Sequence, residues 1–280
     1  MTRRLGGLRL LGNGILYASL AVVTLVTLFP LLYAISASLM TTQEVSAYPP
    51  VLLPAHPALG NFGDVLRAVP LLREYFNSIL VSTLVTVGQL GTATLAAYAF
   101  AFLRFPLRNV TFGVFVATMM VPAEAVLIPN YLFFADRGLI NSYQALVLPF
   151  LAAGFGTFLL RTFFMTFPRE LWEAALMDGC GHLRFLWSIL VPLSRPALAT
   201  LGIYVFLSTW NQYFWPLLVT RTDDMTTVQI GISRLRDVEA AQGPNLVLAG
   251  TVLVLIPTLV LIYAGQRHIV RGLTSGAIRG

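Results

Sequence analysis

Charged residues gather in one short segment of this chain, set between very apolar stretches. Glu173 and Asp178 lie there with Ala174 and Ala175 between them, and Gly179 follows. Charged side chains are unfavourable in lipid, so a chain this apolar gains nothing there from such an insert. We therefore expect the segment to hold a partner on the water side of a membrane.

Several kinds of covalent chemistry are excluded by residue type. All 18 basic residues are arginine, so the chain has no lysine for a phosphate-binding P-loop or a Schiff base. Cys180 is the only cysteine, which excludes an intrachain disulfide and favours a small packing residue. His56, His182 and His268 have no metal-ligand spacing and are interpreted as surface or interface residues. We expect no catalytic residue, no metal site and no bound cofactor.

Glu124 is a second candidate site, because it is the only acid placed well inside an apolar stretch. A carboxylate in a membrane is disfavoured by about 2.5–3.5 kcal/mol, so a functional role is the default hypothesis. Pro122 and Pro129 flank it and can break a helix, which frees backbone groups to line a cavity. The alternative is a structural pair with an arginine or a helix end.

A third candidate is the run Trp210, Asn211, Gln212 and Tyr213. Amides hydrogen-bond hydroxyls and aromatic rings cover C–H faces, so this run suits recognition of a sugar or polyol. The alternative is ordinary helix packing with an aromatic belt at the membrane interface.

The composition of the chain indicates that transmembrane helices position these residues. The chain is 57% hydrophobic and only 11% charged, with a mean hydropathy of +0.78, whereas soluble domains carry about 25% charged residues. Uncharged runs of about 20 residues are long enough to cross a bilayer as helices. They predict a single all-α transmembrane domain over residues 1–280, with six spans at about 11–40, 75–103, 109–134, 139–161, 196–220 and 244–266.

The arginines predict the orientation of these spans. With the N-terminus in the cytoplasm, the cytoplasmic segments hold 12 of the 18 arginines and three acids, and the other side holds six arginines and nine acids. The positive-inside rule therefore places both termini and the loop 166–195 in the cytoplasm.

That loop has the signals of a helix, a turn and a second helix. Pro168 suits the first turn of a helix, and Glu173 lies near its positive N-terminal end. Gly179 and Gly181 predict the turn, and Pro192 sets the angle at which the chain re-enters the membrane. Small Ala174 and Ala175 would allow a partner to approach closely. A helix that contacts only lipid headgroups is the alternative, but its acids would face an anionic leaflet.

The spacing of this loop resembles the signature loop of ABC importer permeases. Glu173-Ala174-Ala175, Gly179 and Ile189-Leu190-Val191-Pro192 carry the resemblance, with Val191 and Cys180 as small departures. Arg104-Phe105-Pro106 resembles a turn of the same family, the run 210–216 resembles its carbohydrate-importer version, and the tail from Gln266 resembles the end of the maltose-type G subunit. The segments 105–109, 122–124 and 163–166 resemble the glycerol-3-phosphate permease branch.

The resemblance implies a type I ABC importer permease fold in the bacterial cytoplasmic membrane. It implies partners: a second homologous permease, two ATPase subunits that bind ATP and Mg²⁺, and an extracytoplasmic solute-binding protein. The solute would be a carbohydrate or glycerol-3-phosphate. Residues implied to couple to the ATPase are Glu173, Ala174, Ala175, Asp178, Gly179 and Arg184. The tail 267–280 would reach the ATPase dimer interface through Thr274, Ser275, Gly276, Ala277, Arg279 and Gly280.

Two other classes of protein remain open at this stage. An ion-gradient-driven secondary transporter is the alternative function, although a lone intramembrane Glu and the lack of an evident repeat count against it. A membrane-embedded enzyme would need clustered catalytic residues within the spans, and the sequence has none.

Overall fold

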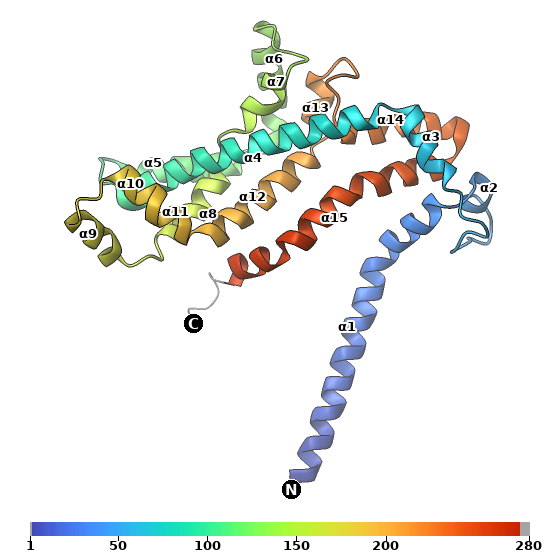
Figure 1. Cartoon of the computed structure of the whole chain (residues 1–280), viewed down its shortest axis with the longest axis horizontal. Helices are drawn as coiled ribbons and strands as arrows, with labels where there is room; N and C mark the ends of the chain where they lie inside the picture. The colour runs from blue at the N-terminus through green and yellow to red at the C-terminus, as the bar shows by residue number, and fades with distance from the viewer. Residues whose placement is uncertain (1, 275–280) are drawn as a thin grey trace. The chain divides into compact units, whose positions relative to one another are not determined.

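The computed structural model describes the backbone of residues 2–274 and the side chains of residues 13–236 and 243–266. Within this part every regular element is a helix, which confirms the all-α prediction (Figure 1). The chain divides into two compact units: residues up to 69 with 232–255, and residues 70–231 with those from 256 onward. The α-helices are α1 Thr2–Ser38, α2 Thr42–Val45, α3 Gly60–Ala68, α4 Leu71–Phe102, α5 Arg108–Ala117, α6 Leu127–Asp136, α7 Tyr143–Val147, α8 Gly154–Phe164, α9 Arg169–Met177, α10 His182–Phe185, α11 Val191–Leu193, α12 Arg195–Trp210, α13 Phe214–Val219, α14 Val228–Gln242 and α15 Pro244–Thr274.

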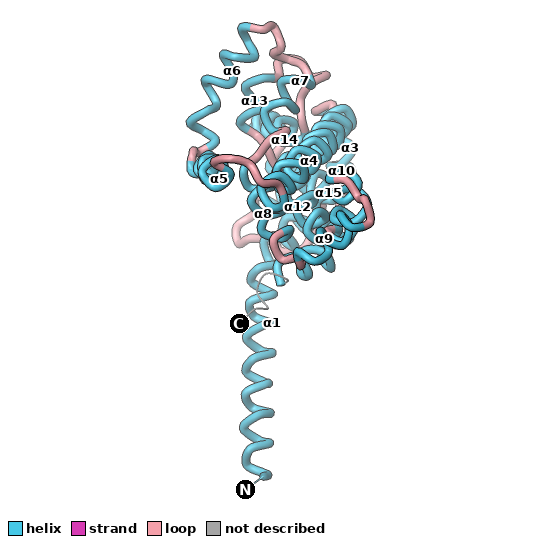
Figure 2. Tube along the Cα trace, turned by 90° about the vertical axis from the view of Figure 1, so that its left-hand side faces the viewer, coloured by secondary structure: helices cyan, strands magenta, loops and turns pink. Residues whose placement is uncertain are grey.

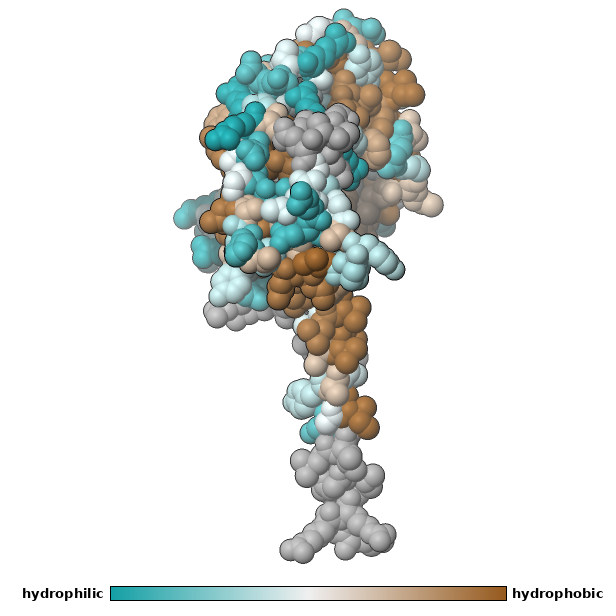
Figure 3. All heavy atoms as spheres, turned by 90° about the vertical axis from the view of Figure 1, so that its right-hand side faces the viewer, coloured by the Kyte–Doolittle hydropathy of each residue, from teal (hydrophilic) through white to brown (hydrophobic). Residues whose placement is uncertain are grey.

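In the first unit, α1 is apolar on all sides. Its apolar stretch Asn13–Ser38 is exposed from residue 13 to residue 30 and is buried within the chain only at Ala37 and Ser38, and hydrophobic residues lie along its described part (Figure 3). A helix that is hydrophobic all round needs an apolar surrounding, which here is lipid or another subunit. Its length and composition are those of a membrane span.

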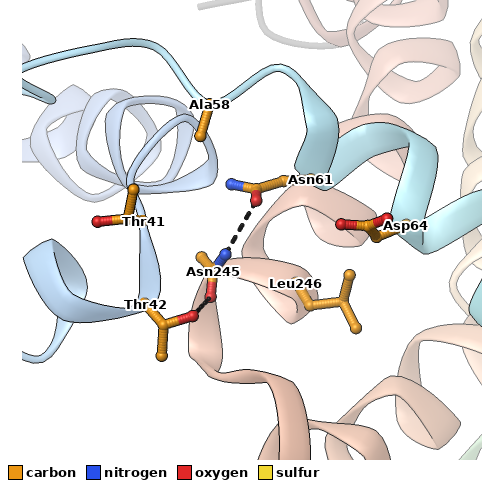
Figure 4. A pocket seen from close by; sticks show the side chains of 7 residues that line it. All are labelled: Thr41, Thr42, Ala58, Asn61, Asp64, Asn245 and Leu246. Carbon is orange, nitrogen blue, oxygen red and sulfur yellow. Dashed lines mark hydrogen bonds between the residues drawn. The ribbon is translucent and has the colours of Figure 1, made fainter.

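Side-chain amides close the end of α1. Asn61 donates from Nδ2 to the carbonyls of Ser38 and Met40 at 2.8 and 2.9 Å. Asn245 donates to Oδ1 of Asn61 at 3.0 Å and accepts from the hydroxyl of Thr42 at 3.0 Å (Figure 4). The last carbonyls of a helix have no partner within it, so this relay satisfies them and joins α1 to α3 and α15 inside the unit. A polar cavity of about 480 Å³ lies beside the relay.

In the second unit, α4 is the central element and packs against α8 and α12 (Figures 1 and 2). One continuous apolar core runs through these helices and reaches α9 and α10 through Ala175 and Phe185. The coupling loop of the sequence analysis is therefore packed onto the helical core of its own unit.

A polar layer holds the first turns of α4. Asn77 donates to the carbonyls of Asp224 and Thr226 at 2.8 and 2.7 Å, and its Oδ1 accepts from the hydroxyl of Tyr143 at 2.7 Å. The backbone N–H of Val228 donates to the Ser78 hydroxyl at 2.9 Å. The loop before α14 is thus fixed to α4 by buried hydrogen bonds.

Three predicted spans are single helices and three are interrupted. Asn13–Ser38, Leu71–Phe102 and Pro244–Gln266 are each long and apolar enough to cross a membrane. Three bent pairs also qualify, so the described chain has up to six spans: Arg108–Met120 with Ala123–Asp136 at 93°, Tyr143–Phe150 with Gly154–Phe164 at 42°, and His182–Leu193 with Arg195–Trp210 at 80°. In Figure 2, α6 turns away from α5.

The fifth predicted span differs most from the structure. A helix continuous over 196–220 is wrong, since α12 ends at Trp210 and α13 begins at Phe214. Pro216 has no N–H for the carbonyl of Gln212, and its ring would clash with that carbonyl in a continuous helix. The sequence motif 210–213 therefore lies at a break between helices.

Candidate functional site

The segment of Glu173 folds as the short helix α9. It begins at Arg169 after Pro168, whose extended backbone (φ −58°, ψ 137°) makes it the cap rather than part of the first turn. Glu170 occupies the first turn, where a carboxylate is stabilised by the positive end of the helix.

Gly179 ends α9 in the way that the sequence predicts. Its φ is +72°, a left-handed conformation that residues with a Cβ rarely adopt. The N–H of Cys180 donates to the carbonyl of Ala175 at 2.8 Å, and that of Gly179 donates to Leu176 at 3.0 Å. These two bonds form a Schellman motif, which turns the chain sharply towards α10.

An aromatic cluster fixes the inner side of α9. The Trp172 ring stacks on His182 with centroids 4.7 Å apart and contacts Phe185 edge-on at 4.8 Å. Nδ1 of His182 lies 2.8 Å from the hydroxyl of Tyr98, near the C-terminal end of α4. Phe102, on the same helix, contacts Phe185 at 5.5 Å. The position of α9 is therefore set by α4 rather than by the loop around it.

The outer side of α9 mixes acids with exposed apolar side chains. Met177 is 89% exposed and Leu171 is 42% exposed. Glu170, Ala174 and Asp178 are exposed beside them. Exposed apolar side chains set among charged ones are typical of a surface that binds another protein.

One predicted contact residue is wrong. Ala175 is only 6% exposed and belongs to the core of its own unit, so it is not available to a partner. Its small side chain instead lets α9 approach the chain's own helices. Glu173, Ala174, Asp178, Gly179 and Arg184 are all exposed, as a contact role requires.

Sequence reasoning missed Met177, Leu171 and the fixing role of His182. Met177 falls on the face opposite Trp172 and Ala175, so the helical period contains its signal, whereas Leu171 lies closer to the side of Ala175. The sequence predicts His182 as a surface or interface residue, and it is exposed, but the sequence does not indicate that its ring joins α9 to α4. Cys180 is buried, as predicted for a packing residue.

The segment after α10 shows how the chain leaves this surface. Residues Leu186–Leu190 form a π-helical turn, and a bend of 80° separates His182–Leu193 from α12. Pro192 cannot donate to the helix, so the ladder of hydrogen bonds widens there. The predicted re-entry angle at Pro192 and Pro196 agrees with this bend.

The run 210–213 lies where α12 ends. Trp210 is buried to 2% exposure against Tyr75 and Phe206, and its Nε1 has no hydrogen-bond partner among the described residues. Asn211 donates to the carbonyl of Leu207 at 2.8 Å and caps the helix. Gln212 and Tyr213 are half-buried within the break.

Glu124 lies beyond the break that the sequence predicts at Pro122. It is exposed in the short 3₁₀ turn Ala123–Val126 that leads into α6. In the part of the chain that the structure describes, no hydrogen bond or ion pair joins it to the run 210–213. The helices that follow the two sites, α6 and α13, contact each other within the chain.

The structure bears on the remaining predictions only in part. The described residues contain no group of three or more His, Cys, Asp or Glu placed to hold a metal ion. The proposed tail residues Ser275, Gly276, Ala277, Arg279 and Gly280 lie outside the described residues, and only the backbone of Thr274 is described.

An all-helical chain with apolar spans and a short exposed helix fixed to its core has the features expected of a membrane permease of the importer type. Residues 89–275 match the family described as "Binding-protein-dependent transport system inner membrane component". The chain belongs to this family.

Relatives and a solved structure agree with this assignment. The chain is 39% identical over 257 residues to the sn-glycerol-3-phosphate transport system permease protein UgpE of Agrobacterium fabrum, covering 89% of this chain and 91% of that protein. It is 37% identical over 273 residues to the protein of the same name from Rhizobium meliloti, covering 95% and 97%. It matches a chain of a bacterial ABC transporter involved in the import of the acidic polysaccharide alginate, with TM-score 0.79 and 26% identity, covering 91% of this chain and 95% of that chain.

Family membership settles the broad class. The chain is a multi-pass inner-membrane component of a transport system that works with a binding protein, and it is not an enzyme. The type I ABC importer permease fold is confirmed. The ion-gradient-driven alternative has no support from these relatives.

Proposed function

We propose that this chain is one of two permease subunits that form the path of an ABC importer for a sugar or polyol-type solute. Glycerol-3-phosphate is the first candidate, because relatives of 37–39% identity are named for its transport. The proposed mechanism is supported by one observation. The outer face of α9 is exposed and partly apolar, and α9 is attached to α4 through the contact of His182 with Tyr98.

That face is the proposed docking surface for an ATPase subunit. Met177 and Leu171 would enter an apolar cleft, and Glu173 and Asp178 would meet basic side chains at its rim. ATP and Mg²⁺ would bind to the ATPase. Closure of the ATPase pair on ATP would move α9 and, through it, α4. ATP binding then shifts an inward–outward equilibrium by its different affinity for the two states.

The proposed orientation follows from charge. With α9 in the cytoplasm, both termini are cytoplasmic and most arginines are on the same side. The tail Thr274–Gly280 would then lie on the ATPase side, where the family resemblance expects it to contact the ATPase dimer.

The proposed solute path runs past the two helix breaks. Backbone groups freed at such breaks can line a cavity. Trp210 adds a buried indole N–H without a partner among the described residues, and Glu124 adds a carboxylate in an apolar segment. Facing residues of the second permease would complete the path.

Reconstitution of the complete importer tests the proposal. The chain is expressed with the permease, ATPase and binding-protein genes next to its own, and the assembly is placed in liposomes. We expect the ATPase to co-purify and the glycerol-3-phosphate-loaded binding protein to stimulate ATP hydrolysis and uptake. Absence of an ATPase from the purified assembly would overturn the importer assignment. Stimulation by a sugar but not by glycerol-3-phosphate would overturn only the assignment of glycerol-3-phosphate as the solute.

A further inference from the structure

A large cavity is lined by residues from the C-terminal end of α4, the start of α5, the end of α8 and α9. Its volume is about 1150 Å³. Four arginines line it against a single carboxylate, that of Glu173. The arginines are Arg104, Arg108, Arg161 and Arg169. Of its charged lining residues, Glu173 belongs to the proposed docking surface, and no proposed transport step uses the four arginines.

Two of these arginines are held in place by neutral groups. The Arg161 guanidinium lies 3.9 Å from the centre of the Phe112 ring, and its Nε donates to the carbonyl of Phe100 at 3.3 Å. Arg108 donates from Nη1 to the carbonyl of Leu103 at 3.2 Å. A ring and two carbonyls position these cations without neutralising them.

None of the four arginines forms an ion pair with another described residue. Glu173 lines the same cavity without pairing with any of them. A concave site with this excess of positive charge attracts an anion. Guanidinium groups fit phosphate oxygens through paired N–H donors, so phosphate is the anion that the lining favours.

The backbone between α4 and α5 is bent to bring two of these arginines together. Leu107 has φ 59°, a left-handed conformation that is uncommon for a residue other than glycine. The turn carries Arg104 and Arg108 to the same cavity. Left-handed backbone of this kind is disfavoured for a residue with a Cβ, so the surrounding structure must hold it in place.

The wall of the cavity continues into an apolar surface. Phe105, Leu107 and Val110 line it and are exposed, and Val114 continues the exposed apolar side of α5. A soluble phosphate would leave this apolar surface exposed, whereas an acyl chain would cover it. The neighbouring charge and apolar area match the two ends of a phospholipid.

We propose that this cavity binds the phosphate headgroup of an anionic phospholipid from the cytoplasmic leaflet, with the acyl chains along α5. The side of the membrane rests on the orientation proposed above. The bound lipid would neutralise the arginines beside α9 and stiffen the attachment of α9 to the ends of α4 and α8.

Lipid retention by the purified full-length chain tests the proposal. The chain is placed in nanodiscs of neutral phosphatidylcholine with graded phosphatidylglycerol, and retained phosphatidylglycerol is measured by native mass spectrometry. Arg104→Gln and Arg169→Gln are the test variants, because these exposed side chains make no contact that the fold needs. We expect about fivefold weaker retention for each, the size of one surface arginine's attraction to anionic lipid.

Arg195→Gln is the matched control, since Arg195 is exposed on the same proposed side but lies outside the cavity. It should retain phosphatidylglycerol like the unaltered chain. Equal retention by Arg104→Gln, Arg169→Gln and Arg195→Gln would overturn the proposal. So would displacement of the lipid by excess inorganic phosphate, which would assign the site to a free anion.

Binding of the ATPase subunit to the same variants tests the lipid proposal separately from the proposed function. Loss of ATPase binding in Arg104→Gln with unchanged lipid retention would overturn the lipid site and assign these arginines to the partner. Lipid retention needs neither ATP nor the ATPase, so a failure of ATPase docking leaves its result intact.

Discussion

The hydroxyl of Tyr98 lies 2.8 Å from Nδ1 of His182 and joins the end of α4 to the turn that follows α9. The indole of Trp172 stacks on the same imidazole, so one histidine ring contacts α4 on one side and α9 on the other. This contact joins the proposed docking surface to the helical core, beside the direct ring contact of Phe102 with Trp172 at 6.3 Å.

Tyr98→Phe removes the hydrogen bond and keeps the ring. We expect the free energy of unfolding to fall by about 1 kcal/mol, the net value of one such bond, and solute-stimulated ATP hydrolysis to become less tightly coupled to uptake. Thermal unfolding and the ratio of ATP hydrolysed to solute imported check this. Tyr263→Phe is the control, because Tyr263 is 79% exposed. An unchanged ratio would remove the coupling role of this contact.

Met177→Asp places a charge in the centre of the proposed docking surface. We expect ATPase affinity to fall by at least about 30-fold, because a central apolar contact is typically worth 2 kcal/mol or more. Binding of the purified ATPase to the permease in nanodiscs measures it. Met177→Leu keeps the apolar contact and should bind normally. Normal binding by Met177→Asp would show that the ATPase docks elsewhere.

Gly179→Ala introduces a Cβ at a backbone φ of +72°. No atom within 4 Å would contact that Cβ, so the expected loss of about 1–2 kcal/mol comes from backbone strain alone. Thermal unfolding should show it. Gly91→Ala, at an equally open position inside α4, should be neutral or slightly stabilising. Equal stability of both variants would argue against the Schellman turn.

Glu44 makes the first unit sensitive to acid. Its carboxylate accepts from the backbone N–H of Thr41 and of Ala55, both at 2.9 Å, and these bonds hold its pKa below the usual value. A lowered pKa in the folded state contributes stability that is present above the unfolded pKa of about 4.3 and is lost as the pH falls through the folded pKa. We expect protease cleavage in the segment 41–59 to increase over that range. In Glu44→Gln the cleavage should be high already at neutral pH and change little with acid.

Glu124→Gln tests the carboxylate at the helix break. We expect uptake to fall about tenfold, the value of one hydrogen bond to a charged group in the solute path. Uptake by reconstituted liposomes at saturating binding protein measures it. Asp136→Asn, at the far end of α6, should transport normally. Unchanged uptake in Glu124→Gln would confine this residue to a structural role.

The helix–turn–helix at 166–195 could be predicted because its signals are local. A left-handed glycine and a proline after an apolar run each act within one or two turns of the chain. The burial of Ala175 and the Tyr98–His182 contact could not, because they depend on which face of α9 meets a helix about 80 residues earlier. Likewise the uncharged runs predicted six crossings. They did not predict the break at 211–213, where Pro216 prevents α12 from continuing.

The helix α4 contains no proline and runs unbroken over 32 residues, about 48 Å. Tyr98 lies near one of its ends, and Asn77, which holds the carbonyls of Asp224 and Thr226, lies near the other. With no proline between these residues, α4 can act as one continuous lever. If the ATPase docks on α9 as proposed, a displacement at Tyr98 would reach the loop before α14 at the opposite end of the helix.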